Sequence, residues 1–243
     1  MTTSYGLDVF PAGVLAAYST RQGGVSRDGL DMNLSFNVGD DPANVLSNRK
    51  LFFGGLGIRF DELAIPGQVH SARIRAVTAA GSYPETDALL TSTPRVFLCV
   101  TFADCVPILL HDPVRKTVAA VHAGWRGTAS GIAAGAVKQL GEEYGTRPQD
   151  LIGFLGPAAA DCCYSVGEEV SARFDQRFVR RINGQPFLDL KGANLAQLAD
   201  AGVDPRRFEV NPHCTISEHR MFHSHRRDGS KSGRMMAVIG IAG

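Results

Sequence analysis

Three separate segments of the sequence place a thiol or an imidazole near the end of an expected strand. Cys105 lies in the segment Ala-Asp-Cys-Val-Pro at 103–107, after an apolar run. His122 ends another expected strand, and His70 lies within Gly-Gln-Val-His-Ser at 67–71, which we expect to be extended. Taken singly, such residues more often belong to the structure than to a site, because most free cysteines pack as small hydrophobic side chains.

Together, the three residues form a His/Cys/His set that suits a metal ion. Zinc takes nitrogen and sulfur ligands in tetrahedral geometry, and three protein ligands with one open position is the catalytic arrangement. The long separations between His70, Cys105 and His122 exclude a zinc-finger knuckle, so folding must assemble the site. Asp104 is predicted to orient one of these ligands. The alternative is that Asp104 is an ordinary carboxylate of a turn, with no role at the site.

The elements that must position these residues follow from hydrophobic periodicity. Helices are expected over 43–56, 129–144, 167–181 and 194–201, and strands or extended segments over 66–77, 95–100, 108–111, 117–122, 151–155 and 235–241. Because strands and helices alternate, the fold class is α/β or mixed α+β, with residues 1–243 as one domain.

Composition restricts the class of partner and compartment. The chain has 243 residues and a net charge of +1, which gives no electrostatic case for nucleic acid or an anionic membrane surface. No apolar stretch is long enough to cross a bilayer and no signal peptide is recognised, so a cytoplasmic location is expected. An odd count of five cysteines argues against a disulfide framework.

Other polar clusters have weaker functional interpretations. The segment Gly-Pro-Ala-Ala-Ala-Asp-Cys-Cys-Tyr at 156–164 is interpreted as a tight loop that packs small side chains. Arg226 and Arg227 could bind a phosphate or carboxylate, or form a solvated basic turn. Most of the four histidines at 213, 219, 223 and 225 are expected to face solvent. The patterns GxxxxGK[ST], HExxH, GxSxG, GxGxxG and the zinc deaminase HxE with PCxxC are all absent.

Taken as an ordered set, the motifs resemble those of the laccase-domain proteins. This family is also known as polyphenol oxidases and peptidoglycan-editing factors, and its members are regarded as purine nucleoside phosphorylases. The motifs that carry the resemblance lie at 19–26, 33–35, 38–42, 48–49, 68–70, 86–88, 103–107, 122–128, 156–157, 162–164, 226–229 and 233–235. The sequence departs from the common pattern at Phe102, Ser165 and His225, which leaves the three ligand positions intact.

The resemblance implies a four-layer α/β/β/α sandwich with mixed sheets and a zinc ion held by His70, Cys105 and His122. It also implies phosphorolysis of adenosine, inosine, guanosine and methylthioadenosine with phosphate, and adenosine deamination as a side activity. Purine nucleosides and phosphate are thus the expected partners. Phosphate needs a cationic fork to hold it, and Arg21, Arg226 and Arg227 are the predicted binders.

Three alternatives use the same residues differently. A cysteine hydrolase would take Cys105 as nucleophile and His122 or His70 as base, without metal. A copper polyphenol oxidase would use a similar ligand set, although no methionine lies near the three ligands in sequence to serve as an axial ligand. A non-enzymatic factor would edit cell-wall precursor use by binding. Preferred nucleoside and oligomeric state do not follow from the sequence.

Overall fold

The apolar runs of the sequence form two stacked six-stranded sheets in the structure, a computed structural model that describes residues 4–243. The first sheet has the order β1-β2-β14-β7-β3-β5, with the bounds Ser4–Gly6, Val14–Ser19, Met235–Ile241, Phe97–Phe102, Leu63–Gly67 and Gly81–Pro84. The second has the order β13-β10-β8-β9-β6-β4, with the bounds Phe208–Val210, Ile152–Leu155, Val106–Asp112, Thr117–Ala123, Ala88–Thr91 and Ile74–Ala76. Both contain parallel and antiparallel pairs.

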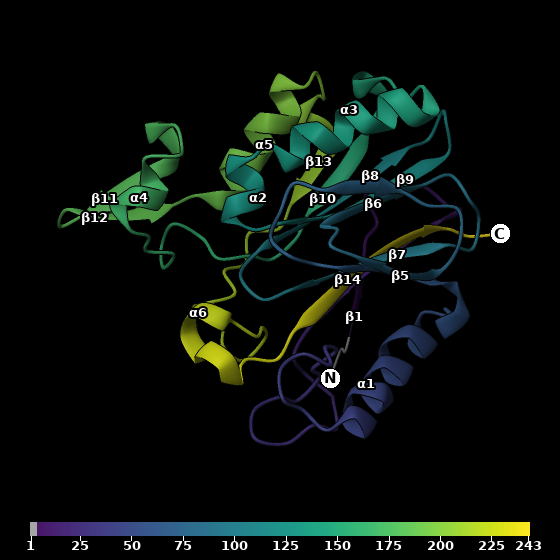
Figure 1. The fold of residues 1–243 in the computed structure, drawn as a ribbon, viewed down its shortest axis with the longest axis horizontal. Coiled ribbons are helices and arrows are strands. Elements are labelled where there is room, and N and C mark those ends of the chain that lie inside the picture. Colours follow the sequence, from purple (N-terminus) through teal and green to yellow (C-terminus); the bar gives the residue numbers. More distant parts are fainter. Residues whose placement is uncertain (1–3) are drawn as a thin grey trace.

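Helices cover the two outer faces of this pair of sheets (Figure 1). Helix α1 (Pro42–Gly55) covers the first sheet, and α2 (Trp125–Ala129), α3 (Ile132–Tyr144) and α5 (Leu190–Asp200) cover the second. Short helices α4 (Glu168–Ser171) and α6 (His225–Asp228) lie outside these layers. Five 3-10 turns complete the helical segments, at Phe60–Glu62, Pro148–Asp150, Gln176–Phe178, Pro205–Arg207 and Gly229–Lys231. The predicted mixed α/β class with two mixed sheets is therefore confirmed.

Strand alternation explains why four layers form. In β7, Phe97 and Cys99 pack toward α1, whereas Leu98 and Val100 pack between the sheets. In β9, alanines and valines alternate in the same way between the inter-sheet core and the core under α3. Successive side chains of a strand point to opposite faces, so strands covered on both sides must be apolar throughout. The continuous apolar runs of the sequence are these doubly covered strands.

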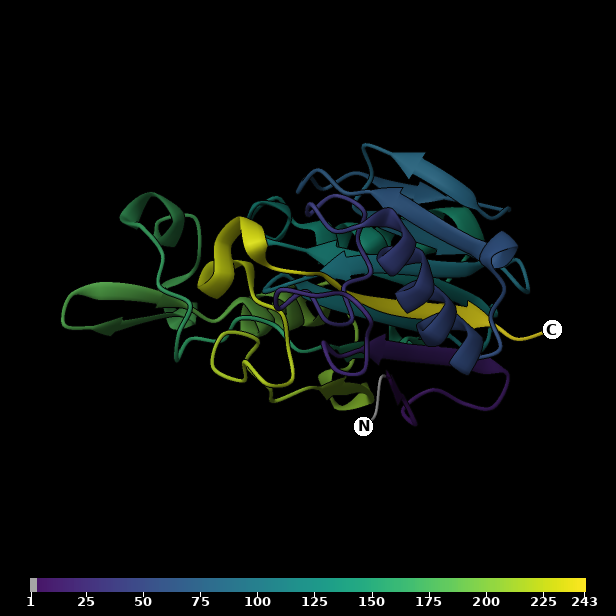
Figure 2. The same cartoon turned by 90° about the horizontal axis from the view of Figure 1, so that it is seen from below.

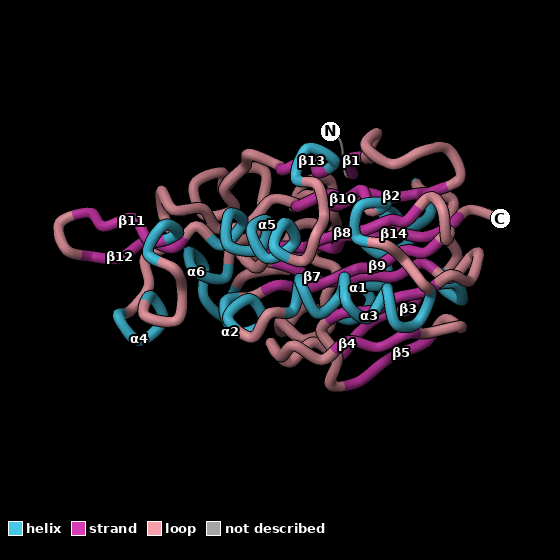
Figure 3. Tube along the Cα trace, turned by 90° about the horizontal axis from the view of Figure 1, so that it is seen from above, coloured by secondary structure: helices cyan, strands magenta, loops and turns pink. Residues whose placement is uncertain are grey.

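A hairpin and two short helices extend from one end of the sandwich. Strands β11 (Val179–Ile182) and β12 (Gln185–Leu188) form a separate two-stranded sheet that projects with α4 away from the main body (Figures 1 and 3). Helix α6 lies between this projection and the sheets, as the view from below also shows (Figure 2). This end of the molecule carries the loops that surround the candidate site.

Two predicted elements were wrong. The helix expected over 167–181 is only α4, after which the chain turns at Asp175 and enters β11. The apolar side chains at Val170, Phe174 and Phe178 do share one core, but they reach it from separate turns. The extended segment expected over 66–77 is broken between β3 and β4.

Other boundaries differ less. The helix expected over 129–144 is α3, which begins only at Ile132 because Gly131 takes a left-handed φ of 77° and separates α3 from α2. Strands β1, β2, β5, β6, β11, β12 and β13 were not predicted. None of the helices in residues 4–243 combines the length and apolar character needed to span a membrane.

Candidate metal centre

Folding brings the three predicted ligands to one point on the edge of the sandwich. His70 follows β3, Cys105 lies between β7 and β8, and His122 is near the end of β9. Their ligand atoms all lie within 4.8 Å of one another. The two imidazole rings meet edge to face, with centroids 4.9 Å apart and an interplanar angle of 81°. We call this set of three residues the metal centre below.

One buried carboxylate, that of Asp87, holds both histidines of the metal centre. Its Oδ1 lies 2.9 Å from Nδ1 of His122 and accepts a hydrogen bond from the backbone N–H of His70 at 3.0 Å. Its Oδ2 accepts from the N–H and hydroxyl of Ser71, both at 2.7 Å. These bonds fix His70 in a left-handed conformation with φ of 59° and leave Nε2 as the available nitrogen of His122. The carboxylate thus preorganises a ligand in the loop after β3 and a ligand in β9.

A glycine is required where β9 ends against the metal centre. A Cβ atom placed on Gly124 would lie 2.9 Å from Sγ of Cys105 and 3.1 Å from Cδ2 of His70. Such distances leave no room for a side chain, because both neighbours belong to the metal centre. The glycine-rich segment that follows His122 therefore serves close packing around the ligands.

The charges of the metal centre favour a thiolate. Burial acts to raise the pKa of the Cys105 thiol, but the imidazoles of His122 and His70 lower it to about 6. Burial acts in the opposite sense on His122, yet Cys105 and Asp87 raise its pKa to about 9. Metals bind thiolates and neutral imidazoles, so a bound cation would take the place of the imidazolium proton. One sulfur and two imidazole donors fit zinc or copper.

A cavity of about 1360 Å³ opens from the metal centre. His70 is exposed, Cys105 is partly buried and His122 is buried, so one side of the centre faces this space. The cavity is lined by cationic and aromatic side chains, namely Arg49, Arg126, Arg226, Arg234, Phe36, Phe60, Phe102, Trp125 and Tyr164. Its size suits a small organic molecule together with an anion.

Arg226 is the one predicted phosphate binder that lines the cavity. Its guanidinium lies over the ring of Tyr164, with 4.8 Å between Cζ and the centroid, and donates to the backbone carbonyl of Ser165. Asp104 does not bond to a ligand of the metal centre. It accepts from the backbone N–H of Arg226 at 2.6 Å and from the hydroxyl of Thr215 at 2.7 Å. Asp104 therefore fixes α6, and with it the position of Arg226.

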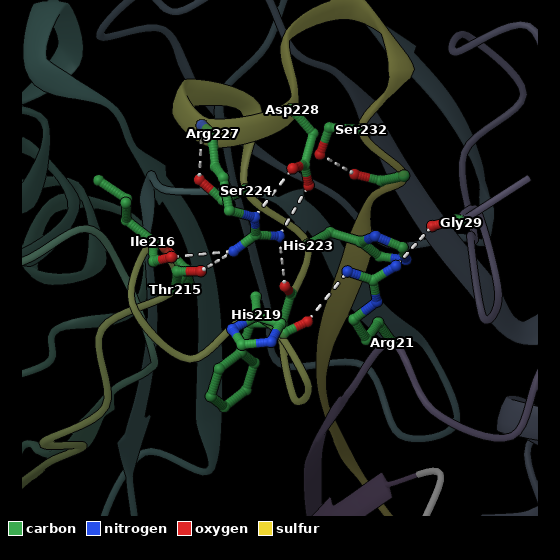
Figure 4. Close-up of polar contacts among 12 residues, drawn as sticks. Arg21, Gly29, Thr215, Ile216, His219, His223, Ser224, Arg227, Asp228 and Ser232 are labelled. Carbon is green, nitrogen blue, oxygen red and sulfur yellow. Dashed lines mark hydrogen bonds and ion pairs between the residues drawn. The ribbon is translucent and has the colours of Figure 1, made fainter.

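The other two predicted phosphate binders are committed to internal contacts (Figure 4). Arg21 forms an ion pair with Asp31 at 2.6 Å and donates to the carbonyls of Gly29 and His219. Arg227 pairs with Asp228 at 2.7 Å, and its guanidinium donates to the carbonyls of Thr215, Ile216 and Phe222. Neither side chain lines the cavity. Their hydrogen bonds tie loops together behind the site.

Comparisons with known proteins identify the family of the chain. Residues 15–242 match the family model described as multi-copper polyphenol oxidoreductase laccase. The chain belongs to this family. It is 35% identical to the purine nucleoside phosphorylase YlmD of Bacillus subtilis, over 94% of this chain and 88% of the relative. It is 39% identical to the purine nucleoside phosphorylase of Deinococcus radiodurans, over 98% and 95%.

Solved structures of this laccase family share the fold. The crystal structure of YlmD from Geobacillus stearothermophilus superposes with a TM-score of 0.92 at 36% identity, and the match covers 98% of this chain and 94% of that one. The YfiH protein of Bacillus licheniformis gives a TM-score of 0.91 at 36% identity, over 94% and 92%. The topology that assembles the metal centre is therefore that of the family.

Sequence reasoning missed several residues around the site. Asp87 was recognised only as part of a motif, and Arg234 likewise, whereas Arg126 and Trp125 were noted without a ligand role. Arg234 is half-buried, and burial lowers its pKa although Cys105 and Asp104 act to raise it. Of the four tail histidines, which were expected to be mostly solvent-facing, His219 and His225 are exposed and His213 is partly exposed, whereas His223 is fully buried. Strand and loop positions far apart in sequence give no local signal for such burial.

Proposed function

We propose that this chain is a zinc-dependent purine nucleoside phosphorylase. The substrates would be adenosine, inosine, guanosine and methylthioadenosine, with phosphate as co-substrate. The observation that carries the proposal is the convergence of His70, Cys105 and His122 on the wall of a cavity that also presents arginine side chains. The names of the relatives support it from a separate direction.

The donor set supplies the metal part of the proposal. His70, Cys105 and His122 would hold the ion, with Asp87 keeping the imidazole of His122 and the backbone of His70 in place. When bound, zinc would supply a Lewis acid at the cavity wall, both for phosphorolysis and for adenosine deamination as a side activity.

The arginines would hold the attacking anion. In phosphorolysis a phosphate oxygen forms a bond to the anomeric carbon, the bond from that carbon to the purine nitrogen breaks, and the purine leaves with a proton. Arg226 over Tyr164 and Arg126 over Trp125 place two guanidinium groups against aromatic rings of one cavity. The planar fork of arginine matches the geometry of phosphate oxygens, and the rings offer stacking surface for a purine.

A second candidate, a cysteine hydrolase, is favoured by one specific arrangement. Cys105 contacts His122, and His122 is held by Asp87, which is the order of a nucleophile, a base and an orienting carboxylate. The imidazole of His70 also lies close to the Cys105 thiol. A catalytic triad has no role for this second imidazole, whereas a metal site would use it as a ligand. Elemental analysis separates the two: bound metal that is lost in Cys105→Ser excludes the hydrolase as the resting state.

Product analysis tests the phosphorylase directly. Purified protein is incubated with adenosine, with and without phosphate, and the products are separated by chromatography. We expect adenine and ribose 1-phosphate only when phosphate is present, with inosine as the product of deamination. His122→Ala should abolish both activities, whereas His213→Ala, which removes a histidine paired with Glu218 outside the cavity, should retain them. The absence of all these products from the metal-loaded protein would overturn the proposal, as would an active His122→Ala variant.

A further inference from the structure

Three cysteines outside the metal centre meet in a second cluster. Cys162 and Cys163 lie in the loop after β10, and Cys214 lies in the loop after β13. Their sulfur atoms all lie within 4.8 Å of one another, and those of Cys162 and Cys163 are 3.0 Å apart. All three are free thiols. We call them the three-cysteine cluster.

The packing of the three-cysteine cluster does not resemble that of core cysteines. Cys162 is exposed and Cys163 is half-buried, although the same loop buries the small side chains of Ala158 and Ala159. Only Cys214 is buried. Sulfurs that share one ion through bonds of about 2.3 Å lie at most roughly 4.6 Å apart, so the observed spacing needs only small side-chain shifts to bind one. An exposed thiol at the rim gives such an ion a path from solvent.

The surroundings of Cys214 favour a negatively charged sulfur. Although burial acts to raise its pKa, donors around the sulfur lower it, chiefly the backbone N–H groups of Ser217 and Ala160. The ammonium of Lys191 is buried close by, where it donates to the carbonyl of Asn211 at 2.6 Å. For Cys162, burial and the two neighbouring thiols raise the pKa to about 12.

We propose that Cys162, Cys163 and Cys214 form a second metal site, which takes a soft d10 cation, either monovalent copper or zinc. Thiolate ligands select these ions over magnesium, calcium or manganese. Among the described residues, no fourth histidine, cysteine or carboxylate completes the group. Three sulfurs suit three-coordinate monovalent copper, and zinc would add a water. On binding, each thiol releases its proton to solvent.

The site would join a segment that lines the cavity to a segment that supports Asp104, another lining residue. Cys163 precedes Tyr164, which lines the cavity, and Cys214 precedes Thr215, whose hydroxyl bonds to Asp104 at 2.7 Å. An ion held by both segments would thus tie the loop that carries Tyr164 to the loop that holds Asp104, and both of these residues line the cavity. Its role is structural, and the site is separate from the ligands His70, Cys105 and His122.

Metal competition in the full-length chain tests this proposal. The background is Cys105→Ser, which removes the sulfur of the metal centre. The reduced protein competes under anaerobic conditions with a chromophoric chelator, in one arm for monovalent copper and in the other for zinc. We expect one equivalent of ion per chain in at least one arm, and the arm with tighter binding identifies the ion. Adding Cys162→Ser or Cys214→Ser should weaken binding at least tenfold.

The matched control adds Cys99→Ala, since Cys99 is buried between the first sheet and α1, away from the cluster. This variant should bind the ion as the background does. Because Cys162 is exposed, Cys162→Ser should fold normally, and a thermal unfolding curve verifies this. Equal binding by the background and Cys162→Ser, or no uptake of either ion, would overturn the proposal. A disulfide among the three cysteines in the reduced protein would do so too.

Discussion

Nδ1 of His122 lies 2.9 Å from Oδ1 of Asp87, and the same carboxylate also accepts the backbone N–H of His70. One side chain thus sets the ring orientation of one ligand and the backbone of another. Asp87 is buried, and burial acts to raise its pKa, but hydrogen bonds from His122 and Ser71 lower it to about 2. The carboxylate stays charged and keeps both ligands in place before any ion binds.

Replacing this carboxylate should weaken metal binding while leaving all three ligands present. We expect Asp87→Asn to lower zinc affinity by roughly 10-fold to 100-fold, the usual effect of losing a partner behind a metal-bound histidine. Competition with a zinc chelator measures the change. The control is Asp112→Asn, the same substitution at a buried turn carboxylate that binds Val114 and Arg115, and it should bind zinc as the wild type does.

A methyl group at Gly124 should disrupt the metal centre by contact alone. The added Cβ would lie 2.9 Å from Sγ of Cys105, so the thiol must move. We expect Gly124→Ala to lose most of its metal and its activity, as measured by elemental analysis and product formation. Gly54→Ala in α1 is the matched control, because its Cβ would meet no atom within 4 Å. Full metal content in Gly124→Ala would show that the ligands are less closely packed than described.

Of the predicted phosphate binders, Arg226 should bind phosphate and Arg227 should contribute only to stability. Arg226→Gln should raise KM for phosphate by about tenfold to a hundredfold, because a hydrogen bond to a charged group contributes roughly 1.5–3 kcal/mol. Arg227→Gln should leave KM for phosphate unchanged and lower Tm, because its guanidinium pairs with Asp228 and with backbone carbonyls away from the cavity. Steady-state kinetics and thermal unfolding measure both. An Arg227 variant with the larger KM effect would contradict this division.

His223 should make the fold less stable in mild acid. Burial lowers the pKa of His223 to about 3. The nearby cations of Arg21, Arg234 and Arg227 act in the same direction, whereas Asp228 acts to raise the pKa. The unfolded chain has the ordinary value near 6.5, so it binds the proton first as pH falls. The contribution to stability is complete above about pH 6.5 and is lost as pH falls toward about 3, at roughly 1.4 kcal/mol per pH unit.

Denaturant unfolding at pH 7 and pH 5 measures this effect. Between pH 7 and pH 5, the free energy of unfolding of His223→Phe should fall by about 2 kcal/mol less than that of the wild type, because phenylalanine cannot bind a proton when the chain unfolds. Phe222→Leu, a substitution at the neighbouring buried residue, should lower stability by the same amount at both pH values. An unchanged pH dependence in His223→Phe would show that the imidazole is not held neutral.

The sequence supported the metal centre better than its surroundings. Residue type and strand position singled out His70, Cys105 and His122, and the structure brings them together. Asp87 carries no such signal, because it acts only after β3 of the first sheet packs against β6 of the second, next to β9. The arginines were chosen from sequence clusters, yet Arg21 and Arg227 bond to loops within the fold, whereas Arg126 and Arg234 reach the cavity.

The prediction of a helix over 167–181 failed for a comparable reason. Apolar residues four apart at Val170, Phe174 and Phe178 indicate one helix face, but the same core receives them from a helix, a loop and a 3-10 turn. Pairing of β11 with β12 then takes the backbone that a helix would have used. Tertiary contacts favour the hairpin over the helix, and the local sequence pattern carries no information about those contacts.

Zinc-dependent recovery of phosphorolysis is the most direct test of the account. The wild-type protein is stripped of metal with a chelator, and ribose 1-phosphate formed from adenosine and phosphate is measured as zinc is added back. We expect little activity in the stripped protein, recovery that saturates with added zinc, and no activity in Cys105→Ser at any zinc concentration. Full activity in the stripped protein, or phosphorolysis by Cys105→Ser at the wild-type rate, would contradict it.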